Sequence, residues 1–187
     1  DDGKRFLCSF PGAPPYRFGP DDSWVVTGRT NGGFQQVDVR TGTIKRTFPS
    51  RLQFFNGGTD GSFEVSRSGR HLSVRKDYNG EPWMEVWNLV TGELLTTVAT
   101  IVPRECTVFH PDGARMVLPG PDSLLRIWDL AHGKVLMTLP VQAHAYGWSR
   151  DGTRLTVVRS DLEIEELDGS PWKPGVSNAA RIPFQTV

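Results

Sequence analysis

One sequence unit occurs several times in this 187-residue chain, and it constrains the fold more than any single residue does. The clearest copy, Phe109 to Leu139, reads as turn, apolar run, turn, apolar run, turn. Gly69, Gly113 and Gly152 mark corresponding turns at intervals of 44 and 39 residues. These intervals fit a four-stranded propeller blade of roughly 40 to 45 residues and exceed the roughly 33 residues of ankyrin or TPR helical repeats.

The apolar runs predict short strands and no helix. They are rich in branched and aromatic residues, they are bounded by Gly, Pro, Asn and Asp, and no stretch keeps the helical spacing of apolar residues. We therefore predict an all-β chain of four-stranded antiparallel blades, forming part of a propeller. The predicted parts are an incomplete blade at 1–17, four repeats at 18–62, 63–104, 105–143 and 144–169, and a proline-containing tail or closing strand at 170–187.

Two copies end in a motif that resembles the WD40 family. Asp122 precedes Trp128-Asp129, and Glu81 precedes Trp87-Asn88, each by six residues before the tryptophan. The resemblance covers roughly residues 18–169 and implies a propeller in which Asp122 and Trp128 belong to a hydrogen-bonded set that ties the strands of a blade together.

This chain departs from the family pattern in several places. The Gly-His pair that precedes the opening strand is missing, and His144 lies too close to the next turn to replace it. Asn31 is a stand-in for the aspartate of the first copy, whereas Val37 and Glu165 occupy the tryptophan position in the outer copies.

The start of the chain reads as the middle of a repeat. Asp1 to Cys8 resembles the turn and second strand of a blade whose first strand is absent, which predicts the carboxy-terminal portion of a longer protein. Two alternatives stay open: four blades could close into a small ring, or exposed edges could pair with another copy, since an open end leaves unpaired backbone groups.

Charge and cysteine content bound the possible partners and the compartment. The chain has 21 basic and 21 acidic residues, so neither a nucleic acid nor an anionic membrane is expected as its general partner. Cys8 and Cys106 lie in predicted strands and suit buried free thiols, which favours a reducing compartment such as the cytoplasm. No apolar run approaches the length of a membrane span.

No residue pattern predicts catalysis, a metal or a cofactor. The four histidines fall in separate segments without metal-ligand spacing, and no Gly-x-Ser-x-Gly motif occurs. Residues 56–61 are glycine-rich but lack the strand, helix and lysine of a phosphate loop. Glu163, Glu165 and Glu166 could be paired catalytic carboxylates, but the sequence favours a charged edge strand that prevents sheet-to-sheet pairing.

Two long connections are the best candidates for binding. They are the insertion Lys76–Trp83 and the link Phe48–Gly61, and their candidate contact residues are Arg51, Phe54, Phe55, Tyr78 and Trp83. Alternatively, Phe54, Phe55 and Trp83 fill the seam between blades. The resemblance implies a non-catalytic scaffold that binds a protein partner; the alternatives are a propeller enzyme or small-ligand sensor with a site at the central channel, or a docking appendage of a larger enzyme.

Overall fold

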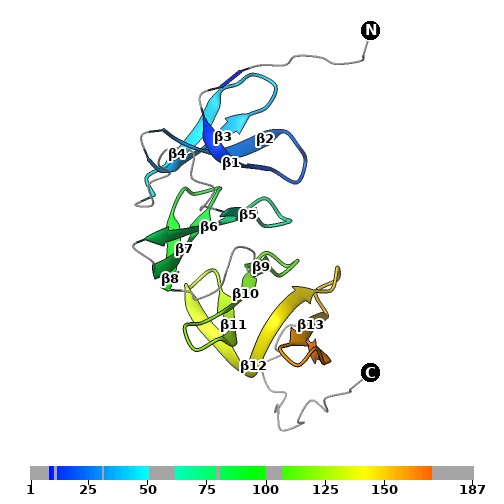
Figure 1. Cartoon of the computed structure of the whole chain (residues 1–187). Helices are drawn as coiled ribbons and strands as arrows, with labels where there is room; N and C mark the ends of the chain where they lie inside the picture. Colours follow the sequence, from blue (N-terminus) through cyan, green and yellow to red (C-terminus); the bar gives the residue numbers. More distant parts are fainter. Residues whose placement is uncertain are drawn as a thin grey trace. The chain divides into compact units, whose positions relative to one another are not determined.

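The computed structural model of this chain describes residues 9–10, 12–30, 32–50, 62–78, 81–99 and 107–169. Every helix or strand assigned within these ranges is a β-strand, and neighbouring strands pair antiparallel (Figure 1). The chain divides into two compact units, Asp1–Ala99 and Thr100–Val187. The predicted all-β class is thus confirmed for the described residues.

The first unit contains two four-stranded sheets, each with its strands side by side in chain order (Figure 1). Short turns suffice to join neighbouring antiparallel strands, which is why each sheet is a simple meander. The first sheet consists of β1 (Ala13–Phe18), β2 (Trp24–Gly28), β3 (Phe34–Asp38) and β4 (Ile44–Phe48), and the second of β5 (Ser62–Val65), β6 (His71–Tyr78), β7 (Glu81–Asn88) and β8 (Leu94–Ala99).

Strands β6 and β7 form an unusually long hairpin for this unit. They pair over eight residues each, up to Tyr78 opposite Glu81, whereas β2 and β3 pair over five. The prediction that the insertion Lys76–Trp83 is a long connection between strands is wrong, because Lys76 lies opposite Trp83 and the strand pairing continues to Tyr78 opposite Glu81. Only the tip of the hairpin, at 79–80, lies outside the described residues.

Aromatic side chains from both sheets form the core of the first unit. Phe34, Phe48, Phe63 and Trp87 are all buried. Phe34 stacks on Phe48 with ring centroids 4.4 Å apart, and Trp87 meets Phe34 edge-on at 5.5 Å. Such pairs contribute about 0.5–1.5 kcal/mol each beyond the burial of their area. These residues, from β3, β4, β5 and β7, pack together between the two sheets.

The second unit is one six-stranded sheet in which a single strand is shared by two groups. β12 runs for 15 residues; its part up to Gln142 pairs with β11, and its part from Ala143 pairs with β13 (Figure 1). The strands are β9 (Val108–Phe109), β10 (Arg115–Pro119), β11 (Leu124–Asp129), β12 (Lys134–Trp148), β13 (Arg154–Arg159) and β14 (Ile164–Asp168).

Two predicted repeat boundaries fall inside strands. The boundary between residues 143 and 144 lies within β12, and the boundary between 17 and 18 lies within β1. The division of the chain into repeats stays a prediction, but a change of repeat at these positions involves no break in the strand.

The core of the second unit is aliphatic and comes from the inner faces of its strands. Alternation along each strand turns every second side chain toward this core. Its buried members are Val117, Leu125, Val141, Leu155, Val157 and Leu167.

The same β-turn precedes the second strand of each group. Asp22, Gly69, Gly113 and Gly152 have positive φ angles of 56°, 69°, 71° and 74°, and each donates its backbone N–H to the carbonyl three residues earlier. Glycine adopts this left-handed conformation without strain, which explains why three of the four positions are glycine. The geometry makes these four positions structurally equivalent.

The turns also fix which residue occupies the tryptophan position in the last copy. Three residues after Gly69 and Gly113, the strands place Leu72 opposite Trp87 and Met116 opposite Trp128. Three residues after Gly152, Leu155 lies opposite Leu167, while Glu165 lies opposite Val157. Leu167 therefore takes this position, and the prediction of Glu165 was two residues out of register.

Candidate functional site

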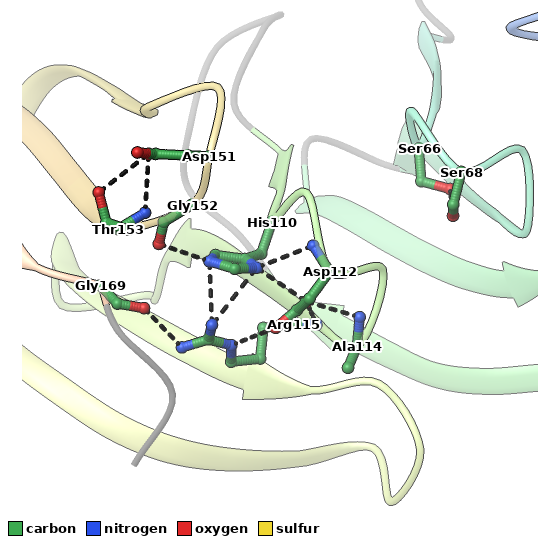
Figure 2. A network of polar contacts seen from close by, with 10 residues as sticks. All are labelled: Ser66, Ser68, His110, Asp112, Ala114, Arg115, Asp151, Gly152, Thr153 and Gly169. Carbon is green, nitrogen blue, oxygen red and sulfur yellow. Dashed lines mark hydrogen bonds and ion pairs between the residues drawn. The ribbon is translucent and has the colours of Figure 1, made fainter.

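A polar cluster built around His110 joins the two groups of strands in the second unit (Figure 2). His110 follows β9, and its side chain is buried. Its Nε2 lies 2.8 Å from the carbonyl oxygen of Gly152, in the turn between β12 and β13. Because a carbonyl oxygen only accepts, this bond requires a proton on Nε2, and Nδ1 then accepts the backbone N–H of Asp112 at 3.0 Å.

Arg115, at the start of β10, extends the cluster to the end of β14. Its Nε donates to Asp112 Oδ2 at 2.9 Å, and its Nη1 donates to the carbonyl oxygen of Gly169 at 3.1 Å. The guanidinium also lies over the ring of Trp148, 5.7 Å from the ring centroid. The guanidinium donors point outward in one rigid plane toward Asp112 and Gly169, while its charge lies over the face of the Trp148 ring.

The Asp112 carboxylate balances the charge of Arg115. Burial acts to raise the pKa of Asp112, but hydrogen bonds from the Ala114 N–H and from the Arg115 side chain, together with the positive charge of Arg115, outweigh it. The pKa of Asp112 is therefore below its ordinary value, and the ion pair is present at neutral pH.

Close packing accompanies the polar contacts of this cluster. The His110 ring meets the Trp148 ring edge-on with centroids 4.5 Å apart. A Cβ atom on Gly152 would come within 2.5 Å of Cε1 and Nε2 of His110. Glycine is thus required at position 152 both for its positive φ and for the approach of the imidazole.

The cluster, called the His110 clasp below, links the strands that follow His110 to Gly152 and Gly169 of the neighbouring strand group. A histidine beside an aspartate is a common acid–base pair in catalysis. In His110, however, Nε2 already bonds to the Gly152 carbonyl oxygen and Nδ1 already accepts the Asp112 N–H. Ser149 and Thr153, on the next turn, direct their hydroxyl groups to Asp151 at 2.6 and 2.9 Å. The contacts of these side chains thus hold turns and strands together.

A second buried polar set, in the first unit, centres on Glu85 of β7. The Glu85 side chain is buried, and its Oε2 accepts hydrogen bonds from Trp87 Nε1 at 2.9 Å and from Ser50 Oγ at 2.6 Å. Ser50 follows β4, so this set joins the two sheets of the first unit. The sequence analysis did not identify this set, although a glutamate between the apolar residues Met84 and Val86 of a predicted strand is a visible signal.

The side chains of Asp122 and Trp128 do not bond to each other in the described residues. Asp122 forms a two-pronged ion pair with Arg126, with both N–O distances 2.7 Å. Trp128 is half-buried, and its Nε1 has no hydrogen-bond partner in the part of the chain that the structure describes. The WD40-type role implied for this pair is therefore not observed, because Arg126 binds both carboxylate oxygens of Asp122.

The residues that follow the tryptophan position close a repeated turn. Asp38, Asn88 and Asp129 each accept, through Oδ1, the backbone N–H two residues later. The hydrogen bond with Lys45, followed by bonds from backbone N–H groups, lowers the pKa of Asp38 to about 2. Asn88 and Asp129, chosen from sequence as repeat residues, thus both stabilise the turn before the outer strand.

The acidic cluster of β14 is paired with arginines of β13. Arg159 Nη1 lies 2.7 Å from Glu165 Oε1, and Arg154 Nη1 lies 3.3 Å from Glu166 Oε2. Alternation places Glu165 and Glu166 on opposite faces, so they do not form a catalytic pair with each other. This arrangement agrees with a charged edge strand.

The structure places one of the five candidate contact residues in detail. Trp83 is half-buried in β7, opposite Lys76 on β6 and Ala99 on β8. Tyr78 ends β6, and Arg51, Phe54 and Phe55 lie outside the described residues. Their role as contacts stays a prediction.

Metal-ligating residues do not gather in the described ranges. Within residues 9–169, apart from the gaps given above, no group of three His, Cys, Asp or Glu side chains could hold a metal ion. His132 bonds to Asp129 on an exposed turn, and His144 lies on β12. A search of the same described ranges for a helix able to cross a membrane finds none.

Comparisons with known proteins identify the fold. No protein-family model matches the chain, and no curated protein matches it significantly. Many solved structures do, among them the crystal structure of the β-propeller domain of Myceliophteria thermophila Cps50 (Swd1), with a TM-score of 0.61 and 16% sequence identity.

That match covers 84% of this chain and 52% of the Cps50 chain, so the chain spans about half the length of the structure it resembles. At this identity the likeness concerns the fold alone, and the WD40 resemblance stays a prediction. The structural match and the four-stranded antiparallel sheets together show that this chain folds as part of a β-propeller.

Proposed function

We propose that this chain is a non-catalytic propeller scaffold that binds a protein partner. The observation that carries the proposal is the long β6–β7 hairpin, which has eight residue pairs where the β2–β3 hairpin has five. Extensions of a rigid repeat scaffold are where binding residues tend to lie. The two strands of this extension are already paired with each other, so binding a partner costs little additional conformational entropy.

Two aromatic residues of this hairpin suit a protein contact. Tyr78 and Trp83 lie on it, and large aromatic residues dominate the binding energy of protein interfaces. Arg51, Phe54 and Phe55 belong to the same candidate set.

The contacts of the polar residues in the two clusters support a non-catalytic role. Glu85 accepts from Trp87 and Ser50, while His110 and Arg115 bond to backbone carbonyls of Gly152 and Gly169. These side chains stabilise the sheets, and a reaction would have to break those bonds.

Quantitative affinity capture from the source cells tests the proposal. Trp83→Ala should lose a partner that the wild-type chain retains, and the purified pair should bind at least about tenfold more weakly, as expected of an aromatic anchor. Val90→Ala is the matched control, because Val90 is 61% exposed in the turn after β7 and should leave binding unchanged.

Two results would contradict the proposal. One is equal capture of all partners by both variants. The other is turnover by the purified chain that a single substitution abolishes.

A further inference from the structure

The turn before β6 carries a serine where the three corresponding turns carry an aspartate. Asp21, Asp112 and Asp151 each precede the residue with a positive φ angle, and Ser68 precedes Gly69 in the same way. Each of these aspartates accepts, through Oδ1, the backbone N–H two residues later, at 3.2, 2.8 and 3.1 Å. An acidic group at this position therefore closes the turn in three of the four copies.

The turn before β13 matches the turn before β6 in sequence and in backbone. Ser149-Arg150-Asp151-Gly152 corresponds to Ser66-Arg67-Ser68-Gly69, so the two segments differ at their third residue alone. In both turns the glycine N–H donates to the carbonyl oxygen of the first serine, at 2.9 and 2.8 Å. The Oγ atom of that serine accepts the N–H of the first strand residue, at 2.9 Å in each turn. The two turns thus have the same hydrogen-bonded backbone.

The side chains at the third position of the two turns have different contacts (Figure 2). Asp151 Oδ1 accepts hydrogen bonds from Ser149 Oγ at 2.6 Å and from the N–H and hydroxyl groups of Thr153 at 3.1 and 2.9 Å. In the described residues Ser68 forms one hydrogen bond, with Ser66 Oγ at 3.1 Å. A negatively charged group on Ser68 would therefore supply the acceptor that Asp151 supplies in the matching turn.

Ser68 lies on the surface between two basic residues. Arg67, Ser68 and Arg70 are exposed, whereas Ser66 is buried. A phosphate beside two guanidinium groups gains charge-assisted hydrogen bonds. Protein kinases also select their substrates in part by the charges around the acceptor residue. The position of Ser68 thus suits both the transfer of a phosphoryl group and its retention.

We propose that Ser68 is a phosphorylation site for a serine/threonine protein kinase that recognises arginine beside its acceptor. In this step the Ser68 hydroxyl oxygen bonds to the γ-phosphorus of ATP, the bond to the leaving ADP breaks, and a base of the kinase takes the hydroxyl proton. The site lies before β6, so it uses neither Tyr78 nor Trp83 and does not depend on the proposed protein partner.

The phosphate gives this turn the acceptor that the other three turns already have. Its oxygens accept the Ser66 hydroxyl and the Arg70 N–H, as Asp151 accepts the corresponding groups of its own turn. The phosphate carries about −1.5 to −2 charges at neutral pH, and the guanidinium groups of Arg67 and Arg70 balance it. Phosphorylation therefore closes the turn and changes its charge from strongly positive to nearly neutral.

Incubation of the folded 187-residue chain with ATP, Mg²⁺ and a purified arginine-directed serine/threonine kinase tests the proposal. Peptide mass spectrometry after chymotrypsin digestion should place a phosphoryl group on Ser68, and Ser68→Ala should lose it; trypsin would cut beside the site. Replacing Arg67 and Arg70 together by glutamine should slow the transfer at least about tenfold, because the kinase loses both charges. Ser23 is the internal control, since it is exposed but follows Asp21-Asp22 and should stay unmodified.

Phosphorus-31 NMR of the phosphorylated chain tests the contacts of the phosphate. Its second ionisation should have a midpoint below the about 6 of a solvent-exposed phosphoserine, because the hydrogen bonds and the two arginines favour the dianion. Independently of any kinase, Ser68→Asp should raise the thermal unfolding midpoint by about 1–3 °C, since it gains the contacts of Asp151. Ser68 left unmodified by an active kinase, transfer that is equally fast to Ser23 or without the arginines, or a phosphate midpoint of about 6 or higher would each overturn the proposal.

Discussion

Removing the Glu85 carboxyl group should destabilise the first unit strongly. In Glu85→Ala the buried Nε1–H of Trp87 loses its acceptor at 2.9 Å, and the hydrogen bond from Ser50 at 2.6 Å is also lost. An unpaired buried donor costs about 1–3 kcal/mol, and a lost hydrogen bond about 1 kcal/mol more. With the missing side-chain methylene groups, the free energy of unfolding should fall by about 3–5 kcal/mol.

A double-mutant cycle separates the hydrogen bond from the packing. Trp87→Phe removes the donor, so Glu85→Ala should cost about 1–2 kcal/mol less in that background than in the wild type. Urea unfolding followed by circular dichroism gives the free energies, and hydrogen exchange of the β7 amides gives the local effect.

The surface variant Glu93→Ala is the control for the loss of a glutamate. Its side chain is exposed, so it should change the free energy of unfolding by no more than about 0.5 kcal/mol. A cost below about 1 kcal/mol for Glu85→Ala, or a coupling to Trp87→Phe of zero within error, would refute this account of the buried set.

Three further predictions concern the turns and the tryptophan position. Gly152→Ala should lower stability by about 2–4 kcal/mol, because it combines a positive φ with a collision against the His110 clasp, whereas Gly147→Ala, with open space around its Cβ, should be close to neutral in thermal unfolding. The Asp38 carboxyl should titrate near pH 2 by NMR, and Lys45→Met should raise that titration midpoint. Because folding lowers the pKa of Asp38, its contribution to stability is present above about pH 4 and is lost as the pH falls toward 2. Trp128→Ala should cost about 1–3 kcal/mol in urea unfolding, less than a fully buried tryptophan, because Trp128 is half-buried; a cost above about 4 kcal/mol would show that it belongs to the core.

Local sequence was sufficient to predict the all-β class and the recurring glycine turns. The glycines at 69, 113 and 152 occupy positions where the backbone needs a positive φ, so their recurrence reports the turn directly. The apolar runs after them are strands because their branched residues fit a sheet with one buried face. These signals lie within a few residues of each other and do not depend on the rest of the fold.

Contacts between residues far apart in the chain could not be predicted from the sequence. His110 bonds to Gly152, 42 residues away, and Ser50 to Glu85, 35 residues away, and neither pairing has a signature in the intervening residues. The role implied for Asp122 failed for a related reason. Arg126 competes for that carboxylate at a distance of four residues, and a motif does not record such competition.

The uninterrupted β12 strand also limits how this repeat array could change during evolution. Repeats separated by loops can be gained, lost or exchanged as modules, because a loop absorbs the change in length. Between the groups on either side of β12 there is no loop, since Gln142 pairs with β11 and Ala143 with β13. The pairing on both sides of this junction is already irregular, between Leu139 and Gln142 and between Ala143 and Ala145, so a further insertion would add to an existing change of register. We therefore expect the two halves of this unit to be gained or lost together, although their sequences look like separate repeats.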